Sequence, residues 1–195
     1  DRILDLAWQN GIRLNLVINN HGQVSEDTDR EWQNNPYSRA NGGFIDDALQ
    51  YFIDPRALAR QDALRRYIAG RYADHPGVLG WKLWSEQDLT VAGRRDKIDV
   101  LATWHAQAAA RWGVLDTYHH PLTTHWSGNF RRVFPSVAML PGIDFLTIDA
   151  YHEPFDGSGK GQLLAELLLD STTRRGGLSA RYNKPVLVSE HGGNW

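Results

Sequence analysis

The chain of 195 residues has no cysteine, a single methionine and no apolar run long enough to cross a bilayer. Without cysteine, a disulfide framework and a thiolate metal site are both excluded. The formal net charge is only −2, so nothing in the charge balance favours nucleic acid or an anionic membrane as a partner. Absence of cysteine also fits an oxidising compartment, so a secreted or periplasmic location is favoured over a cytoplasmic one, although the first residues lack the pattern of a signal peptide.

What is present is the composition of one globular domain, with 42% hydrophobic and 23% charged residues. Five apolar segments have the pattern of strands and end in polar residues. They cover residues 12–19, 78–86, 120–126, 143–152 and 185–190. Helical patterns lie before or between them, and they cover residues 3–9, 55–72, 98–112 (closed by Gly113) and 163–168. A long polar segment over residues 23–53 is typical of a functional loop.

Strands that alternate with helices, without hairpin signals, indicate a parallel sheet covered by helices. We therefore expect an α/β fold, a (β/α)8 TIM barrel present as an incomplete segment of about strands 3 to 7. Residues 1–195 would form a single catalytic barrel domain that lacks barrel units at both ends, because a complete barrel needs about 250 residues. An open, doubly wound five-stranded sheet is the alternative.

Two of the predicted strands end in a glutamate, Glu86 and Glu190. In a parallel barrel the carboxyl ends of the strands form one rim, where active sites are built. Strict alternation along the first of these strands places Glu86 on the same side as Lys82 and Trp84. Either glutamate alone is equally compatible with a structural ion pair, but two on one rim favour acid–base or nucleophilic chemistry on a glycosidic bond.

The sequence around Glu86 resembles a known family. Residues 71–86 read Arg-Tyr-Ala-Asp-His-Pro-Gly-Val-Leu-Gly-Trp-Lys-Leu-Trp-Ser-Glu, similar to the fourth strand of clan A glycoside hydrolases, especially the cellulase- and mannanase-like group of family five. Asn35-Pro36-Tyr37 with Gly42-Gly43, and residues 185–193, resemble other parts of the same pattern. The likeness extends over nearly the whole chain.

This resemblance implies a retaining glycosidase that degrades β-linked polysaccharides or oligosaccharides, with Glu86 as acid/base and Glu190 as nucleophile. It also implies sugar-binding or nucleophile-holding roles at strand exits for His21, Tyr151 and His152. Trp126 and Trp195 are candidate platforms for stacking on sugars. Asn20 and Asn129 are weaker candidates. A carbohydrate is the expected partner, and no cofactor or metal is expected.

Two residues depart from the family pattern. Ser85 stands where the family has an asparagine that binds the sugar 2-hydroxyl, and Lys82 replaces a common acidic residue. Ser85 is shorter, so its contact with substrate would need a bridging water. A catalytically weak or inactive glycan-binding barrel is therefore the alternative function.

Other chemistries have little support in the sequence. No histidine pair has HxH or HExxH spacing, and His119 and His120 would point apart on a strand. The Gly157–Gly161 segment lacks the frame of a phosphate-binding loop, and Ser189 is not part of a GxSxG elbow.

Overall fold

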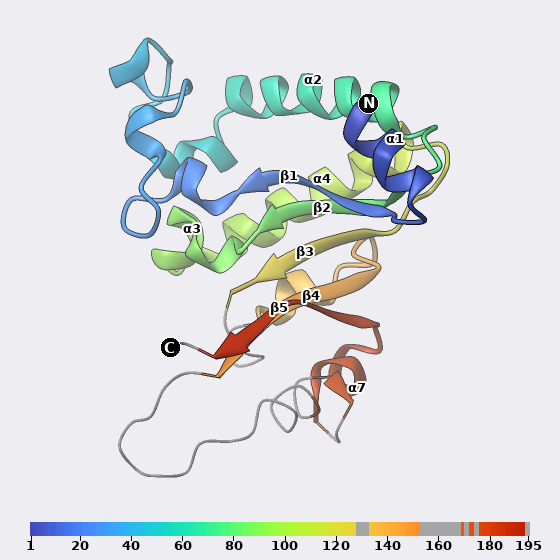
Figure 1. Cartoon of the computed structure of the whole chain (residues 1–195). Coiled ribbons are helices and arrows are strands. Elements are labelled where there is room, and N and C mark those ends of the chain that lie inside the picture. Colours follow the sequence, from blue (N-terminus) through green and yellow to red (C-terminus); the bar gives the residue numbers. More distant parts are fainter. Residues whose placement is uncertain (128–132, 153–168, 170–171, 174–175, 194–195) are drawn as a thin grey trace.

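The computed structural model of the chain describes residues 1–127, 133–152, 169, 172–173 and 176–193. The described residues form one parallel sheet with strand order β1-β2-β3-β4-β5. The strands are β1 (Leu14–Asn20), β2 (Val78–Ser85), β3 (Leu122–Trp126), β4 (Phe145–His152) and β5 (Val186–Gly193). All five run in one direction, and the sheet curls into a half-barrel whose carboxyl edge lies at the left of Figure 1. The predicted incomplete (β/α) barrel is confirmed, and each predicted strand is present with small shifts at its ends.

Helices cover one face of this sheet. They are α1 (Arg2–Gln9), α2 (Pro55–Tyr72), α3 (Val91–Arg94), α4 (Ile98–Leu115), α5 (Pro135–Ala138) and α7 (Leu178–Tyr182). The long helix α2 begins as predicted, because Asp54 accepts a hydrogen bond from the Arg56 N–H and Pro55 occupies the first turn. The helix predicted at residues 163–168 lies outside the described residues.

Helix α4 does not end at Gly113, as predicted, but continues to Leu115. Glycine inside a helix costs about 1 kcal/mol relative to alanine. Packing of the last turn outweighs this cost, because the ring of Trp112 stacks on Trp81 of β2 at a centroid distance of 4.6 Å. The chain leaves the helix at Asp116, whose carboxylate accepts a hydrogen bond from the Trp81 indole N–H.

The segment between β1 and α2 is ordered by short 3-10 helices rather than by long elements. These are η1 (His21–Val24), η2 (Trp32–Asn34), η3 (Arg39–Asn41) and η4 (Ala48–Phe52). A capping box at Asp47 and Gln50 begins η4. The segment lies at the carboxyl edge of the sheet beside α3 (Figure 1), as expected for a functional loop.

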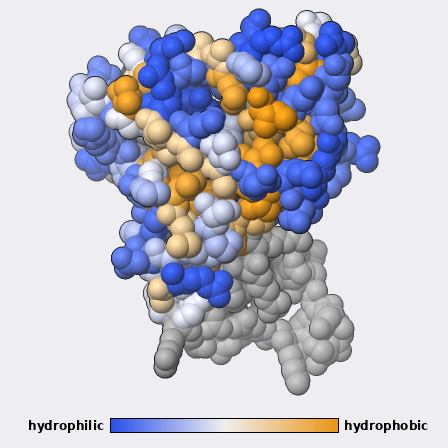
Figure 2. Space-filling model, turned by 180° about the vertical axis from the view of Figure 1, so that it is seen from behind, coloured by the Kyte–Doolittle hydropathy of each residue, from blue (hydrophilic) through white to orange (hydrophobic). Residues whose placement is uncertain are grey.

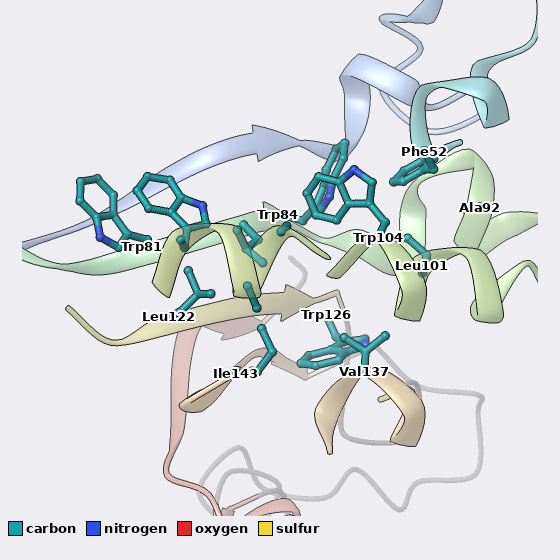
Figure 3. Close-up of a cluster of buried hydrophobic side chains, with 14 of the residues drawn as sticks. Phe52, Trp81, Trp84, Ala92, Leu101, Trp104, Leu122, Trp126, Val137 and Ile143 are labelled. Atoms are coloured by element: carbon teal, nitrogen blue, oxygen red, sulfur yellow. The ribbon is translucent and has the colours of Figure 1, made fainter. Parts of the chain in front are cut away.

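Tryptophans fill the space between the sheet and α4 (Figure 3). Trp84 packs on Trp104 of α4 and on Phe52 of η4 at centroid distances of 5.6 and 5.5 Å. The prediction that Trp84 shares a side with Glu86 is therefore wrong, since Trp84 and Trp81 both contact α4. Seen from behind, the surface is mostly hydrophilic with scattered hydrophobic areas (Figure 2). Among the described residues, no helix is both long and apolar enough to cross a membrane.

Candidate functional site

Glu86 lies one residue beyond β2, in an unusual backbone conformation. Its φ and ψ are 52° and 57°, in the left-handed region that residues other than glycine seldom adopt. Its backbone N–H donates to Nδ1 of His125 on β3 at 3.3 Å. Strand alternation therefore does not determine the direction of the Glu86 side chain, because the chain turns at this residue.

His21 connects Glu86 to the loop after β1. Its Nδ1 lies 3.0 Å from Glu86 Oε2, and its Nε2 lies 3.0 Å from Asp29 Oδ2. The first contact has the distance of an ion pair but not the angles of a hydrogen bond. Because both ring nitrogens face carboxylates, the doubly protonated imidazolium is the form that fits. Burial lowers the pKa of His21, but the Glu86 and Asp29 carboxylates outweigh burial and raise it above its ordinary value.

The same contact changes the acidity of Glu86. The close contact with His21 holds the pKa of Glu86 below its ordinary value, against the opposing effect of burial. A general acid needs the opposite shift. The proton of this pair therefore resides on His21 in the free site.

A second buried pair lies behind Glu86. His125 of β3 and Asp149 of β4 are both fully buried, and His125 Nε2 is 2.6 Å from Asp149 Oδ1. Since Nδ1 accepts the Glu86 N–H, the ring proton must be on Nε2, which donates to Asp149. The other carboxylate oxygen, Oδ2, has no hydrogen-bond partner among the described groups. Burial raises the pKa of Asp149, and the neighbouring Glu190 and Glu86 carboxylates raise it further, while the His125 bond opposes them.

Glu190 reaches this cluster because β5 is irregular. Leu146 and Ile148 pair with Val186 and Val188, but Asp149 pairs with Glu190 after a register shift. Without the shift, alternation would place Glu190 on the same face as Val186 and Val188, which pack against the core. The extra residue, Ser189, turns Glu190 to the face that carries Asp149, as β-bulges do near active sites.

Glu190 lies close to the buried pair as a result. One side-chain ligand atom each from His125, Asp149 and Glu190 lie within 4.8 Å of one another. The Ser189 hydroxyl is 3.3 Å from both His125 Nε2 and Asp149 Oδ1. Strands β2 and β5, which are not neighbours in the sheet, thus deliver their glutamates to one cluster.

Lys82 supplies a positive charge to the cluster. It is only 7% exposed, and burial lowers the pKa of its ammonium group, while Asp149, Glu190 and Glu86 oppose that effect. The ammonium therefore lies within the field of all three carboxylates. A lysine rather than an acidic residue suits this position, because a further carboxylate here would repel the three.

Three of these side chains have the types and spacing of metal ligands, but their hydrogen bonds do not suit a metal. A metal on His125 Nε2 would use the lone pair of that nitrogen and move the ring proton to Nδ1. That proton would then face the Glu86 N–H, which donates to Nδ1. Lys82 already provides a cation at the same place.

The remaining predicted site residues divide into four groups. Ser85 belongs to the cluster, with its hydroxyl 3.4 Å from His125 Nδ1. Trp126 is fully buried and lies beside Val137 of α5, so it contributes to the core and presents no face to a sugar (Figure 3). Tyr151 and His152 are the last two residues of β4, but their side chains are outside the description, as are Asn129 and Trp195. Asn20 accepts a hydrogen bond from the Gly22 N–H and caps η1.

Sequence reasoning missed His125 and Asp149. A usable signal was present, since each is a charged or titratable residue next to apolar residues within a predicted buried strand. Such a residue needs a partner. Two such residues on neighbouring strands can be each other's partner.

The fold and this edge define a parallel (β/α) half-barrel of the TIM-barrel class, with its polar cluster at the carboxyl ends of the strands. No family model matches the sequence, and no curated protein matches it. Among solved structures, the chain is similar to a cold-adapted β-galactosidase from Rahnella sp. R3, with a TM-score of 0.51 and 15% identity. The match covers 78% of this chain and 31% of the β-galactosidase chain, and at this identity it shows a glycosidase-like fold alone.

Proposed function

We propose that this chain carries the two catalytic carboxylates of a retaining glycoside hydrolase that cleaves β-glycosidic bonds in oligosaccharides or polysaccharides. One observation carries the proposal: Glu86 and Glu190, from strands that are not adjacent, meet at the buried His125–Asp149 pair. The glycosidase-like fold and the sequence resemblance to family five support it. The location also supports it, because barrel enzymes have their active sites at the carboxyl ends of the strands.

The reaction would proceed in two displacements. Ionised Glu190 attacks the anomeric carbon, and the bond to the leaving oxygen breaks as Glu86 delivers a proton to that oxygen. Water then attacks the glycosyl ester, giving a proton to Glu86 and releasing Glu190. The positive charge of Lys82 favours the ionised form of the carboxylates between the two steps.

The source of the first proton follows from the His21 contact. Because His21 lowers the pKa of Glu86 and has its own pKa raised, the proton starts on His21 Nδ1 and passes to Glu86 Oε2 as Glu86 protonates the leaving group. Above the raised pKa of His21 this proton is lost. We expect kcat/KM to fall as pH rises through that pKa, and this alkaline fall to shift in a His21→Gln variant. Initial rates between pH 5 and 9 measure both.

Hydrolysis of a panel of aryl β-glucosides, β-galactosides and β-mannosides by the full-length protein tests the proposal. Glu190→Gln should reduce turnover to background on every substrate. Glu86→Gln should lower kcat/KM about 10²- to 10⁴-fold on glycosides with poor leaving groups and far less on dinitrophenyl glycosides, whose leaving group departs without a proton. Glu26→Gln is the matched control, since Glu26 pairs with Arg95 at the surface and should leave rates unchanged. Unchanged hydrolysis in Glu190→Gln would refute the proposal.

A glycan-binding barrel with weak turnover is the second candidate, and the lowered pKa of Glu86 together with Ser85 favours it. Such a protein would bind oligosaccharides without releasing products. A 2-fluoroglycoside separates the two, because a nucleophilic Glu190 forms a stable ester detectable by mass spectrometry. Tight binding without ester formation would identify the second function.

A further inference from the structure

We propose that the buried His125–Asp149 pair is a positioning device that sets the distance between Glu86 and Glu190. Nδ1 of the His125 ring accepts a hydrogen bond from the Glu86 backbone, and Asp149 on the other side of the pair holds β5 at its bulge. The kinetic part of this inference rests on the proposed glycosidase function. Its structural part stands on the hydrogen bonds alone.

The first contact holds a backbone that would otherwise relax. A left-handed conformation costs a non-glycine residue free energy and persists only where its surroundings enforce it. At Glu86 the N–H bond to His125 Nδ1 supplies that constraint, together with the neighbouring Ser85 hydroxyl. Loss of this bond would let Glu86 return towards extended geometry and move its carboxylate.

The second contact holds the strand that carries Glu190. Asp149 pairs with Glu190 in the sheet register immediately after the bulge, and Ser189 places its hydroxyl against both members of the pair. Asp149 Oδ1 therefore lies at the junction between the imidazole and the bulge. A retaining mechanism works only when the two carboxyl groups are about 5 to 5.5 Å apart, so a shared anchor for both has direct value.

The pair acts through other residues rather than on substrate. Both ring nitrogens are occupied, Nδ1 by the Glu86 N–H and Nε2 by Asp149, and both side chains are fully buried. No lone pair or proton of His125 is left for a sugar. His125 and Asp149 are positioning residues on this geometry.

Two substitutions separate the two contacts. Asn at position 125 keeps an acceptor at the place of Nδ1, and Gln keeps a donor at the place of Nε2, whereas Ala keeps neither. On the full-length protein, His125→Ala should lower kcat about 10²-fold with little change in KM. His125→Asn should recover rate mainly on poor leaving groups, which need Glu86. His125→Gln should restore kcat/KM towards the wild-type value mainly on dinitrophenyl glycosides, whose first displacement needs Glu190 but no proton from Glu86.

This crossed pattern is the expected result. Equal losses on both substrate types in all three variants, in proportion to a reduced folded fraction, would show that His125 only supports the fold and would overturn the proposal. Should His125→Ala fail to fold, Ser189→Ala tests the β5 contact without emptying core volume. It should slow dinitrophenyl glycoside turnover, and an unchanged rate would count against the second contact.

A spectroscopic measurement keeps this inference separate from the proposed function. The ¹⁵N spectrum of the His125 ring at neutral pH should show a proton on Nε2 and none on Nδ1. A proton on Nδ1 would overturn the positioning role even if Glu190 proves to be the nucleophile. A protein that hydrolyses no glycoside but shows the expected tautomer would lose the proposed function and keep the anchor of Glu86.

Discussion

The two faces of the same sheet differ in kind. The face towards α4 carries large apolar side chains such as Trp81, Leu146 and Ile148, all fully buried. The opposite face carries Lys82, together with the threonines, histidine and aspartate that β3 and β4 contribute. Side chains alternate between the two faces along each strand. Thr124 therefore points to the helix side, where its hydroxyl lies 2.9 Å from His105 Nε2 of α4.

The difference shows which face of the sheet stabilises the fold and which face contains polar groups in place of apolar ones. The interior of an ordinary barrel is filled by branched apolar side chains. Here the inner positions of β3 and β4 hold polar groups that satisfy one another, as Thr123 and Thr147 do at 2.9 Å. The helix-facing side therefore has to supply most of the folding free energy, and the inner side holds the polar cluster.

The largest effect is expected from the helix-facing side. Trp104→Ala removes a buried ring that contacts Trp84 and Phe52 and whose N–H donates to Gln61. Truncation of a buried tryptophan costs about 3 to 5 kcal/mol in the free energy of unfolding. Urea unfolding measures this, with Trp8→Ala as the control.

Trp8 is 40% exposed on α1, so its loss should cost less than about 1 kcal/mol. Equal losses of unfolding free energy in the two tryptophan variants would contradict the claim that the helix-facing side supplies most of the stability.

The next effect concerns a titratable group buried on the helix-facing side. Burial lowers the pKa of His105 from 6.5 to about 4, and the nearby Arg65 charge contributes, although the bond to the Leu101 carbonyl opposes them. The unfolded chain therefore binds a proton at a pH where the native protein does not. Stability is complete above pH 6.5 and is lost as pH falls towards 4, by ~3 kcal/mol.

Denaturant unfolding at several pH values measures this loss. His105→Asn keeps a donor for the Leu101 carbonyl but cannot titrate, so its stability should depend less on pH between 6.5 and 4 than that of the wild type. Parallel pH dependence in the two proteins would show that other groups cause acid unfolding.

Sequence periodicity predicted the strands and the main helices because each is a regular, amphipathic or apolar segment. It failed at Gly113 and Trp84, where tryptophan packing against α4 outweighed local preference. The same limit applies to the site. The position of Glu86 just after a strand was readable, but Glu190 lies within β5, which continues to Gly193 instead of ending at Glu190 as predicted.

The means by which those two glutamates meet were not readable. A left-handed residue after β2 and a register shift in β5 are single-residue departures from the regular pattern, and no periodicity contains them. His125 and Asp149 were overlooked because each is isolated in its own strand, and only the sheet register makes them partners. The position of Lys82 was noted from the sequence, but the three surrounding carboxylates emerged only from the fold.

The smallest effect is expected on the inner face, at Thr147. Thr147→Val keeps the shape of the side chain and removes the hydroxyl that meets Thr123. Thr123 stays satisfied, because its hydroxyl also lies 2.6 Å from the Phe145 carbonyl, to which it can donate. The expected loss is therefore that of one ordinary hydrogen bond, about 1 kcal/mol, without an unsatisfied buried group. Thr123→Val is the sharper companion, since it removes the donor to Phe145 as well and should cost more. If Thr147→Val instead cost as much as Trp104→Ala, the inner face would be as important for stability as the helix-facing side, and the contrast between the two faces would fail.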